Sequence, residues 1–149
     1  MITCKQITKR FGNVTALAPF DLNLEKGEFV AIKGASGSGK TTLLLTLGGM
    51  LRPTAGEIHY KDSDLYGRSS AELAEYRAQE VGFVFQMFHL VPYLAVEENV
   101  KLALPNGSDS GRALELLEEF GLTNRLTHTP GELRAGERQR VALARALVN

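Results

Sequence analysis

The chain has 149 residues, 44% of them hydrophobic and 23% charged, which suits one globular domain with a sizeable core. Its 17 Lys and Arg balance its 17 Asp and Glu, so the net charge is zero and gives no reason to expect a nucleic-acid partner. The single cysteine, Cys4, excludes an internal disulfide, and no apolar run is long enough for a signal peptide or a membrane span, so the expected location is cytosolic.

The first half of the chain carries strand patterns. Strands are predicted over Ile2–Phe11, around Leu22 and Leu24, over Phe29–Ile32, over Glu57–Tyr60 and over Val81–Phe85. Phe29–Ile32 and Val81–Phe85 are nearly all apolar, which is typical of parallel strands buried on both faces. Lys26–Glu28 reads as the turn before the first of them.

Helical spacing dominates after Phe85, following two earlier helices. Helices are predicted over Lys40–Met50, after a Ser69/Glu72 cap, over Val96–Leu104, over Ala113–Phe120 with Gly121 as C-cap, and over Val141–Val148. Pro105–Ser108 is the clearest loop between them, and its Asn106-Gly107-Ser108 triplet matches a glycosylation sequon of a kind that is common by chance.

A glycine-rich loop carries the clearest chemical signal. It consists of Gly34, Ala35, Ser36, Gly37, Ser38, Gly39, Lys40 and Thr41 and fits G-x-x-x-x-G-K-[ST] in full. Glycines let successive backbone N–H groups point inward at a phosphate, and the helix that begins at Lys40 aims its positive end at the same place. Lys40 supplies a charge for the β- and γ-phosphates and Thr41 a hydroxyl for Mg²⁺. A linker that contains a lysine by chance would lack the flanking strand and helix patterns.

The chain resembles the ATP-binding-cassette (ABC) family, the energy-supplying subunits of transporters. The phosphate loop, Phe11, Gln86 and the stretch Leu133–Leu147 follow the family's order across nearly the whole chain, and Val84–Pro92 resembles the lipoprotein-release and macrolide-export branch. The resemblance implies an α/β P-loop NTPase fold, with an ATP-binding core over residues 1–86 and a helical subdomain over residues 87–149. It also implies ATP and Mg²⁺ as ligands, with Thr42 completing the loop.

Two single residues take roles from the resemblance. Phe11 matches the aromatic that stacks on adenine, and without the family match a core strand aromatic is nearly as good an interpretation. Gln86 matches the glutamine that reaches Mg²⁺ and the water beside the γ-phosphate, at the hinge between core and helical part. A polar residue ending a strand is the plain alternative.

The segment after Gln86 is apolar for a loop. Its apolar side chains are Phe88, Leu90, Val91, Tyr93 and Leu94. In relatives this region faces the membrane subunits, so an exposed patch here would be a partner surface, whereas plain core packing is the other interpretation.

The family's signature Leu-Ser-Gly-Gly-Gln/Glu is altered in this chain. The matching residues are Leu133, Arg134, Ala135, Gly136 and Glu137. In the family the serine hydroxyl and glycine amides contact the γ-phosphate held by the other cassette of a dimer. Arg134 replaces the serine and Ala135 the first glycine, so we expect a weakened contact.

We assign no catalytic residue in this chain. The family's metal-ordering aspartate, catalytic glutamate and γ-phosphate-sensing histidine would follow Asn149, and His59, His89 and His128 stand in no such context. We therefore expect turnover by the chain alone to fail, and its isolated fold to be marginal because central strands are missing.

The leading hypothesis is an ATP-binding subunit of an ABC transporter. It would work as a homodimer or paired cassette beneath membrane permease subunits at the inner face of the cell membrane, without nucleic acid. The alternative is a non-hydrolytic nucleotide-binding or interaction module, which the altered signature favours. An ABC protein of DNA repair or translation and a P-loop kinase fit less well, because the charge is neutral and Leu133–Leu147 would be unexplained.

Overall fold

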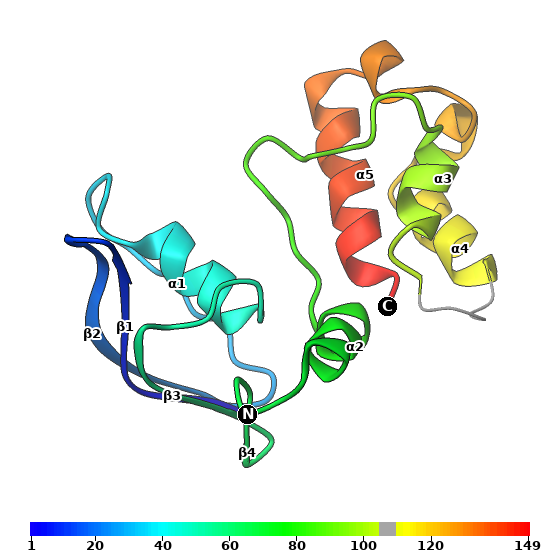
Figure 1. Ribbon diagram of the computed structural model, residues 1–149. Helices are drawn as coiled ribbons and strands as arrows, with labels where there is room; N and C mark the ends of the chain where they lie inside the picture. Colours follow the sequence, from blue (N-terminus) through cyan, green and yellow to red (C-terminus); the bar gives the residue numbers. More distant parts are fainter. Residues whose placement is uncertain (105–109) are drawn as a thin grey trace. The chain divides into compact units, whose positions relative to one another are not determined.

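The computed structural model describes residues 1–104 and 110–149, which form two compact units, Met1–Tyr76 and Arg77–Asn149 (Figure 1). The predicted loop and sequon at Pro105–Ser108 lie outside the described residues. The division of the chain by function at residue 86 remains a prediction.

An antiparallel sheet forms the frame of the first unit. It contains β1 (Ile2–Phe11), β2 (Val14–Leu24), β3 (Ala55–Tyr60) and the short β4 (Ser63–Asp64), in the order β2-β1-β3-β4. The β1–β2 hairpin closes through Gly12 and Asn13, where Gly12 takes a φ of 55°. The strands predicted at Ile2–Phe11, at Leu22 and Leu24 and at Glu57–Tyr60 are therefore confirmed.

Helix α1 (Lys40–Leu47) belongs to the same unit and buries Leu43, Thr46 and Leu47. Two tyrosine hydroxyls satisfy carbonyls at its C-terminal end: Tyr66 donates to Thr46 at 2.7 Å and Tyr76 donates to Leu47 at 3.0 Å. These bonds fix the C-terminal end of α1 and, because the helix is rigid, also the direction in which its N-terminus points. The predicted helix is confirmed, although it ends three residues before Met50.

Helix α2 (Ser70–Glu80) runs across the division between the units. Ser69 and Glu72 form the predicted cap, because the Glu72 carboxylate accepts the Ser69 backbone N–H at 2.8 Å and the Glu72 N–H reaches the Ser69 hydroxyl at 3.3 Å.

The second unit is helical. It contains α3 (Val96–Lys101), α4 (Gly111–Glu119) and α5 (Ala135–Leu147), with 3₁₀ turns η1 (Thr123–Arg125) and η2 (Pro130–Glu132). Their apolar faces meet in one core of Val96, Val100, Ala113, Leu116, Leu117, Leu122, Leu133, Val141, Ala144 and Val148. The three predicted helices are confirmed, and Gly121 adopts the left-handed conformation (φ 66°) after Phe120, the C-cap of α4.

The strands predicted over Phe29–Ile32 and Val81–Phe85 are wrong. Both segments form no strand and have no ladder pairing among the described residues, and Phe29 is 94% exposed and Val30 42%. A strand buried on both faces requires a neighbouring strand and covering layers, and the described part of the chain supplies neither segment with a partner strand.

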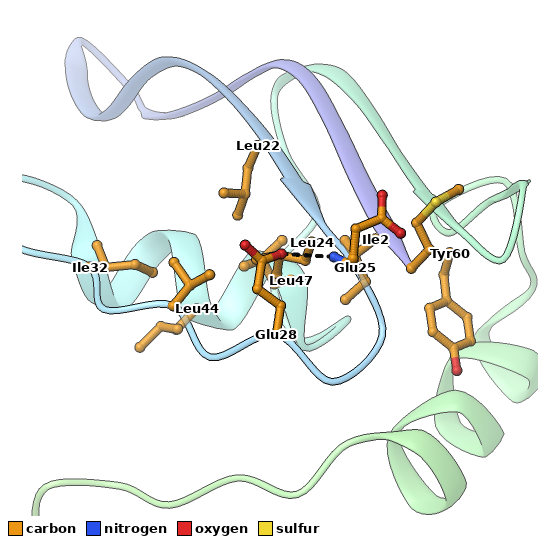
Figure 2. Close-up of a pocket in the computed structure, with 11 residues that line it drawn as sticks. Ile2, Leu22, Leu24, Glu25, Glu28, Ile32, Leu44, Leu47 and Tyr60 are labelled. Atoms are coloured by element: carbon orange, nitrogen blue, oxygen red, sulfur yellow. Dashed lines mark hydrogen bonds between the residues drawn. The ribbon is translucent and has the colours of Figure 1, made fainter.

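An apolar pocket of about 320 Å³ lies beside Phe29–Ile32 in the first unit (Figure 2). Its walls include Leu22 and Leu24 of β2, Leu44 and Leu47 of α1, and Ile32. The Glu25 backbone N–H donates to the Glu28 carboxylate at 2.9 Å at its edge. The pocket shows that the apolar face between α1 and the sheet is only partly covered by residues 28–32.

Candidate nucleotide-binding site

The backbone of the glycine-rich loop takes a shape that only glycine allows at two points. Gly37 and Gly39 have φ values of 79° and 91°. A Cβ on Gly39 would stand 2.4 Å from the carbonyl oxygen of Ala16 in β2, and one on Gly34 would stand 2.6 Å from the Ser38 hydroxyl oxygen. The turn into α1 is thus pressed against the sheet, and residue 39 has no room for a side chain.

The Lys40 ammonium group lies over this loop. Its Nζ donates to the carbonyl oxygens of Gly34 at 2.8 Å and Ala35 at 2.7 Å. These neutral acceptors satisfy the cation without neutralising its charge. Lys40 therefore closes the loop into a ring and keeps a positive charge beside the N-terminus of α1.

The N-terminus of α1 has open hydrogen-bond donors. Gly39 is the N-cap and offers no side-chain cap, and no acidic residue stands in the first turn. The first backbone bond into the helix runs from the Leu43 N–H to the Gly39 oxygen at 2.8 Å. Within the described residues the amides of Lys40, Thr41 and Thr42 therefore have no backbone acceptor, and with Lys40 they form an anion site.

The residues present also fit a magnesium ion. No cluster of three His, Cys, Asp or Glu side chains that could hold a metal exists in the described parts of the chain. Mg²⁺ usually keeps several waters and takes one or two protein ligands plus phosphate oxygens, so it needs no such cluster. The exposed Thr41 hydroxyl stands one residue after Lys40 and suits this role.

Phe11 ends β1 with its side chain largely in solvent. The residue is 53% exposed, and the Lys9 ammonium lies 5.1 Å from the ring centroid. The interpretation of Phe11 as a core aromatic is therefore wrong. An exposed ring at a strand end suits stacking on a planar base, and this role remains a prediction.

Gln86 is exposed and belongs to the second unit, whereas the phosphate loop belongs to the first. It lies inside a tight turn, residues 85–88, in which the Phe88 N–H donates to the Phe85 oxygen at 3.0 Å. The turn places Phe88 and His89 in the left-handed region, at φ values of 61° and 46°. Such conformations cost on the order of 1–3 kcal/mol each, so surrounding contacts must hold them.

The apolar segment after Gln86 is partly core and partly surface. Leu90 packs against the helical core, whereas Tyr93 is 80% exposed and Met87 77%. The core-packing interpretation therefore applies to Leu90 but not to Tyr93. The use of its exposed side chains as a partner surface remains a prediction.

Asn99, which sequence reasoning missed, shapes the end of this segment. It is fully buried, its amide donates to the oxygens of Val91, Leu94 and Ala95 at 3.0–3.1 Å, and its Oδ1 accepts the Val91 N–H at 2.7 Å. The signal in the sequence was a lone amide between the apolar residues Val96 and Val100. Burial of an amide is stabilising only when its hydrogen bonds are made, and here they are.

The residues that match the signature surround the N-terminus of α5. Leu133 is buried, whereas Arg134, Ala135 and Gly136 are exposed, and Arg134 is the N-cap. The arginine side chain has no oxygen with which to accept a helix N–H. Gly136 still has open space around it, because a Cβ there would meet only the Arg140 guanidinium at 3.9 Å.

A carboxylate of the first turn reaches back to the N-cap residue at this helix end. Glu137 accepts the Arg134 backbone N–H at 2.7 Å and the Arg125 guanidinium Nε–H at 3.0 Å. The Arg134 N–H first, and the Arg125 guanidinium second, hold the pKa of Glu137 below its ordinary value. The N-terminus of α5 is thus already beside a negative charge.

The loop, Lys40 and the open end of α1 together have the geometry of a P-loop nucleotide-binding domain. A family model described as "ABC transporter" matches residues 17–149. Since it covers most of the sequence, the chain belongs to the ABC transporter family.

Individual relatives agree with this assignment. The "Lipoprotein-releasing system ATP-binding protein LolD" of Idiomarina loihiensis is 42% identical over 100% of this chain and 69% of its own length. The "Putative hemin import ATP-binding protein HrtA" of Staphylococcus aureus is 41% identical over 99% of this chain and 71% of its own. The chain thus spans about 70% of the length of these relatives.

Solved structures show the same fold. The dimeric structure of MJ0796, a bacterial ABC transporter cassette, matches with a TM-score of 0.90 and 41% identity over 100% of this chain and 70% of the cassette. Its post-hydrolysis state bound to ADP and Pi matches with the same TM-score. In the described residues no helix is long and apolar enough to cross a membrane.

Proposed function

We propose that this chain binds ATP with Mg²⁺ through residues 34–42 and acts as an ATP-binding subunit of an ABC transporter. The observation that supports it most is the Lys40 ammonium resting on two loop carbonyls beside the open amides of α1. A phosphate group is a stronger acceptor for Lys40 than either neutral carbonyl, so the side chain would exchange the carbonyls for phosphate oxygens.

Each predicted residue has a distinct task in this proposal. The amides of the loop and of Lys40, Thr41 and Thr42 hold the phosphates, and Phe11 stacks on the base. The Thr41 hydroxyl and the Gln86 amide oxygen would hold Mg²⁺. The ion supplies charge neutralisation for phosphoryl transfer, in which positioning and electrostatics matter most.

The proposal includes a paired cassette. A solved relative is dimeric, and residues 133–137 would face the nucleotide held by a second copy or a related cassette. Arg134 and Ala135 would weaken this contact, because the first removes a hydroxyl and the second adds a Cβ near the phosphate.

Members of the ABC family hydrolyse ATP, and we propose that residues 1–149 contribute nucleotide binding to this reaction. Residues 1–149 would bind nucleotide, and we assign no general base among them. Membrane permease subunits would be the partners, with the chain held at the inner face of the cell membrane through them. The permease would then select the cargo.

Calorimetry on the purified chain tests this proposal. Lys40→Ala removes a charge-assisted bond and should weaken Mg²⁺-ATP binding roughly 10- to 100-fold. Lys26→Ala, an exposed lysine in a turn outside the loop, should bind as the wild type does. Equal affinity of the wild type and Lys40→Ala would contradict the proposal.

A non-hydrolytic nucleotide-binding or interaction module is the second candidate. The arginine N-cap of α5 favours it, since the helix end that should meet the partner's nucleotide lacks its hydroxyl. A steady-state ATPase assay with Lys40→Ala as blank separates the two, because only the first candidate gives Lys40-dependent turnover in the assembled transporter.

A further inference from the structure

The C-terminal end of α5 and the following Asn149 contact residues 78–89 at successive points, all within the second unit. The Asn149 amide donates to the oxygens of Ala78 at 2.9 Å and Val81 at 3.4 Å. At Gly82 the backbone comes so close to the helix that a Cβ on this residue would stand only 1.8 Å from the carbonyl oxygen of Ala146. The backbone of residues 78–82 is therefore packed directly on the helix end.

Arg145 contacts the two residues at positions 88 and 89, shortly after Gln86 in the chain. Its Nη2 donates to the Phe88 oxygen at 2.6 Å and its Nη1 donates to the His89 oxygen at 2.8 Å. These are the two residues of the turn with left-handed backbone conformations. The planar guanidinium donates to both consecutive carbonyls at once, so Arg145 stabilises the turn in this conformation.

Other features of Arg145 fit a fixed positioning role. The side chain is partly buried, burial lowers the pKa of its guanidinium, and no carboxylate pairs with it among the described residues. Its neighbours Val141, Ala142 and Ala144 are fully buried, so the guanidinium extends from an anchored helix. The exposed Gln86 thus stands between two points of attachment to α5, at Gly82 and at Phe88–His89.

We propose that Arg145 is the positioning residue for Gln86: it locks the turn that contains Gln86 onto α5, so that Gln86 and α5 move as one body. The proposal rests on the function proposed above, in which Gln86 holds Mg²⁺. Arg145 does not touch the nucleotide in this account. It determines where the Gln86 amide can reach and connects that position to the helix whose N-terminus carries residues 134–137.

Amide hydrogen exchange on the full chain without nucleotide tests the lock itself. Arg145→Gln should speed exchange in peptides covering residues 85–90 by roughly tenfold or more, because local opening follows the lost contacts. Arg145→Lys, which keeps one charged donor, should recover part of the protection. Arg138→Gln is the matched control: Arg138 also donates to carbonyls, of Leu133 at 2.7 Å and Pro130 at 3.4 Å, but away from Gln86.

A binding measurement tests the connection to Gln86. The ratio of ATP affinities with and without Mg²⁺ should fall in Gln86→Ala and fall by the same factor in Arg145→Gln, with no further loss in the double variant. The affinity for ATP without Mg²⁺ should stay within about twofold of the wild type in both, since the phosphate loop is unchanged.

The outcomes are distinguishable from failure of the proposed function. Unchanged exchange at residues 85–90 in Arg145→Gln, or equal loosening in Arg138→Gln, overturns the lock. Additive losses in the double variant, or an equal loss of metal-free affinity, show a general structural role and overturn the positioning role. Failure of Lys40→Ala to weaken binding rejects the nucleotide site itself, whereas the exchange result does not depend on nucleotide.

Discussion

The N-termini of α1 and α5 both present the positive end of a helix dipole, but their N-caps and first turns differ. At α1 the N-cap is a glycine, no acid stands in the first turn, and a lysine lies over the loop. At α5 the N-cap is an arginine, and the Glu137 carboxylate reaches back to its N–H. The first end is prepared for an external anion, whereas the second already has an anion of its own. A helix dipole alone therefore does not make a phosphate site, because the residues of the first turn decide what occupies it.

Of the substitutions that test this difference between the two helix ends, Gly39→Ala should have the largest effect, a loss of Mg²⁺-ATP affinity. The substitution puts a side chain at φ 91° and 2.4 Å from the Ala16 oxygen, so the loop must move away from the geometry that aims its amides. We expect Mg²⁺-ATP affinity measured by calorimetry to fall by more than about 100-fold, equivalent to about 2.7 kcal/mol or more.

Gly27→Ala is the control for that variant. Gly27 has a similar φ of 80° but no atom within 4 Å of its ideal Cβ. It should lose about 1 kcal/mol of stability and keep its ATP affinity. Equal binding by Gly39→Ala and Gly27→Ala would contradict the role given to the close contact at Gly39.

Arg134→Ser should make the N-terminus of α5 more like a capped helix. A serine hydroxyl can accept an N–H of the first turn, which the arginine cannot, so stability in urea should rise by about 1 kcal/mol. Arg112→Ser, which changes an exposed arginine of α4, should be neutral or slightly destabilising. No gain from Arg134→Ser would contradict the view that the arginine N-cap leaves first-turn amides without a side-chain acceptor.

Phe11→Ala should have a modest effect on nucleotide affinity. If the phosphate end of the site dominates, loss of the ring should weaken ATP binding by about 1 kcal/mol, roughly fivefold, and Phe11→Trp should bind normally. Phe20→Ala, another partly exposed aromatic of the sheet, serves as the control. A loss as large as that of Gly39→Ala would reverse the order of importance of base and phosphate contacts.

Glu137 should give the smallest effect, seen as a pH dependence of stability. Its pKa is lowered in the fold, so its stabilisation is present above the unfolded value near 4.5 and is lost as the pH falls through the folded pKa. Glu137→Gln should therefore reduce the decline in the urea midpoint between pH 6 and pH 3. If the urea midpoint of Glu137→Gln falls with pH as steeply as that of the wild type, other carboxylates cause the loss of stability. Glu132 is one of them, because the Thr129 N–H and hydroxyl lower its pKa.

The phosphate loop was predictable because its signals are local. The positive-φ glycines, Lys40 and the helix that follows lie within about one turn of each other, so spacing alone determines the geometry. Phe29–Ile32 was not predictable in the same way, since an apolar run forms a strand only when another segment pairs with it. Arg145 and Asn99 escaped sequence reasoning because their acceptors, the oxygens of Phe88 and Val91, lie 57 and 8 residues away and are brought near by the fold.

The most direct test of the central claim is a residue-resolved one. Mg²⁺-ATP is titrated into the ¹⁵N-labelled chain, and amide shifts are followed at residues 34–42 and at residues 134–137. The account predicts saturable shifts at residues 34–42 that disappear in Lys40→Ala, and none at the N-terminus of α5 in a monomeric sample. Shifts at residues 134–137 without shifts at residues 34–42 would contradict it.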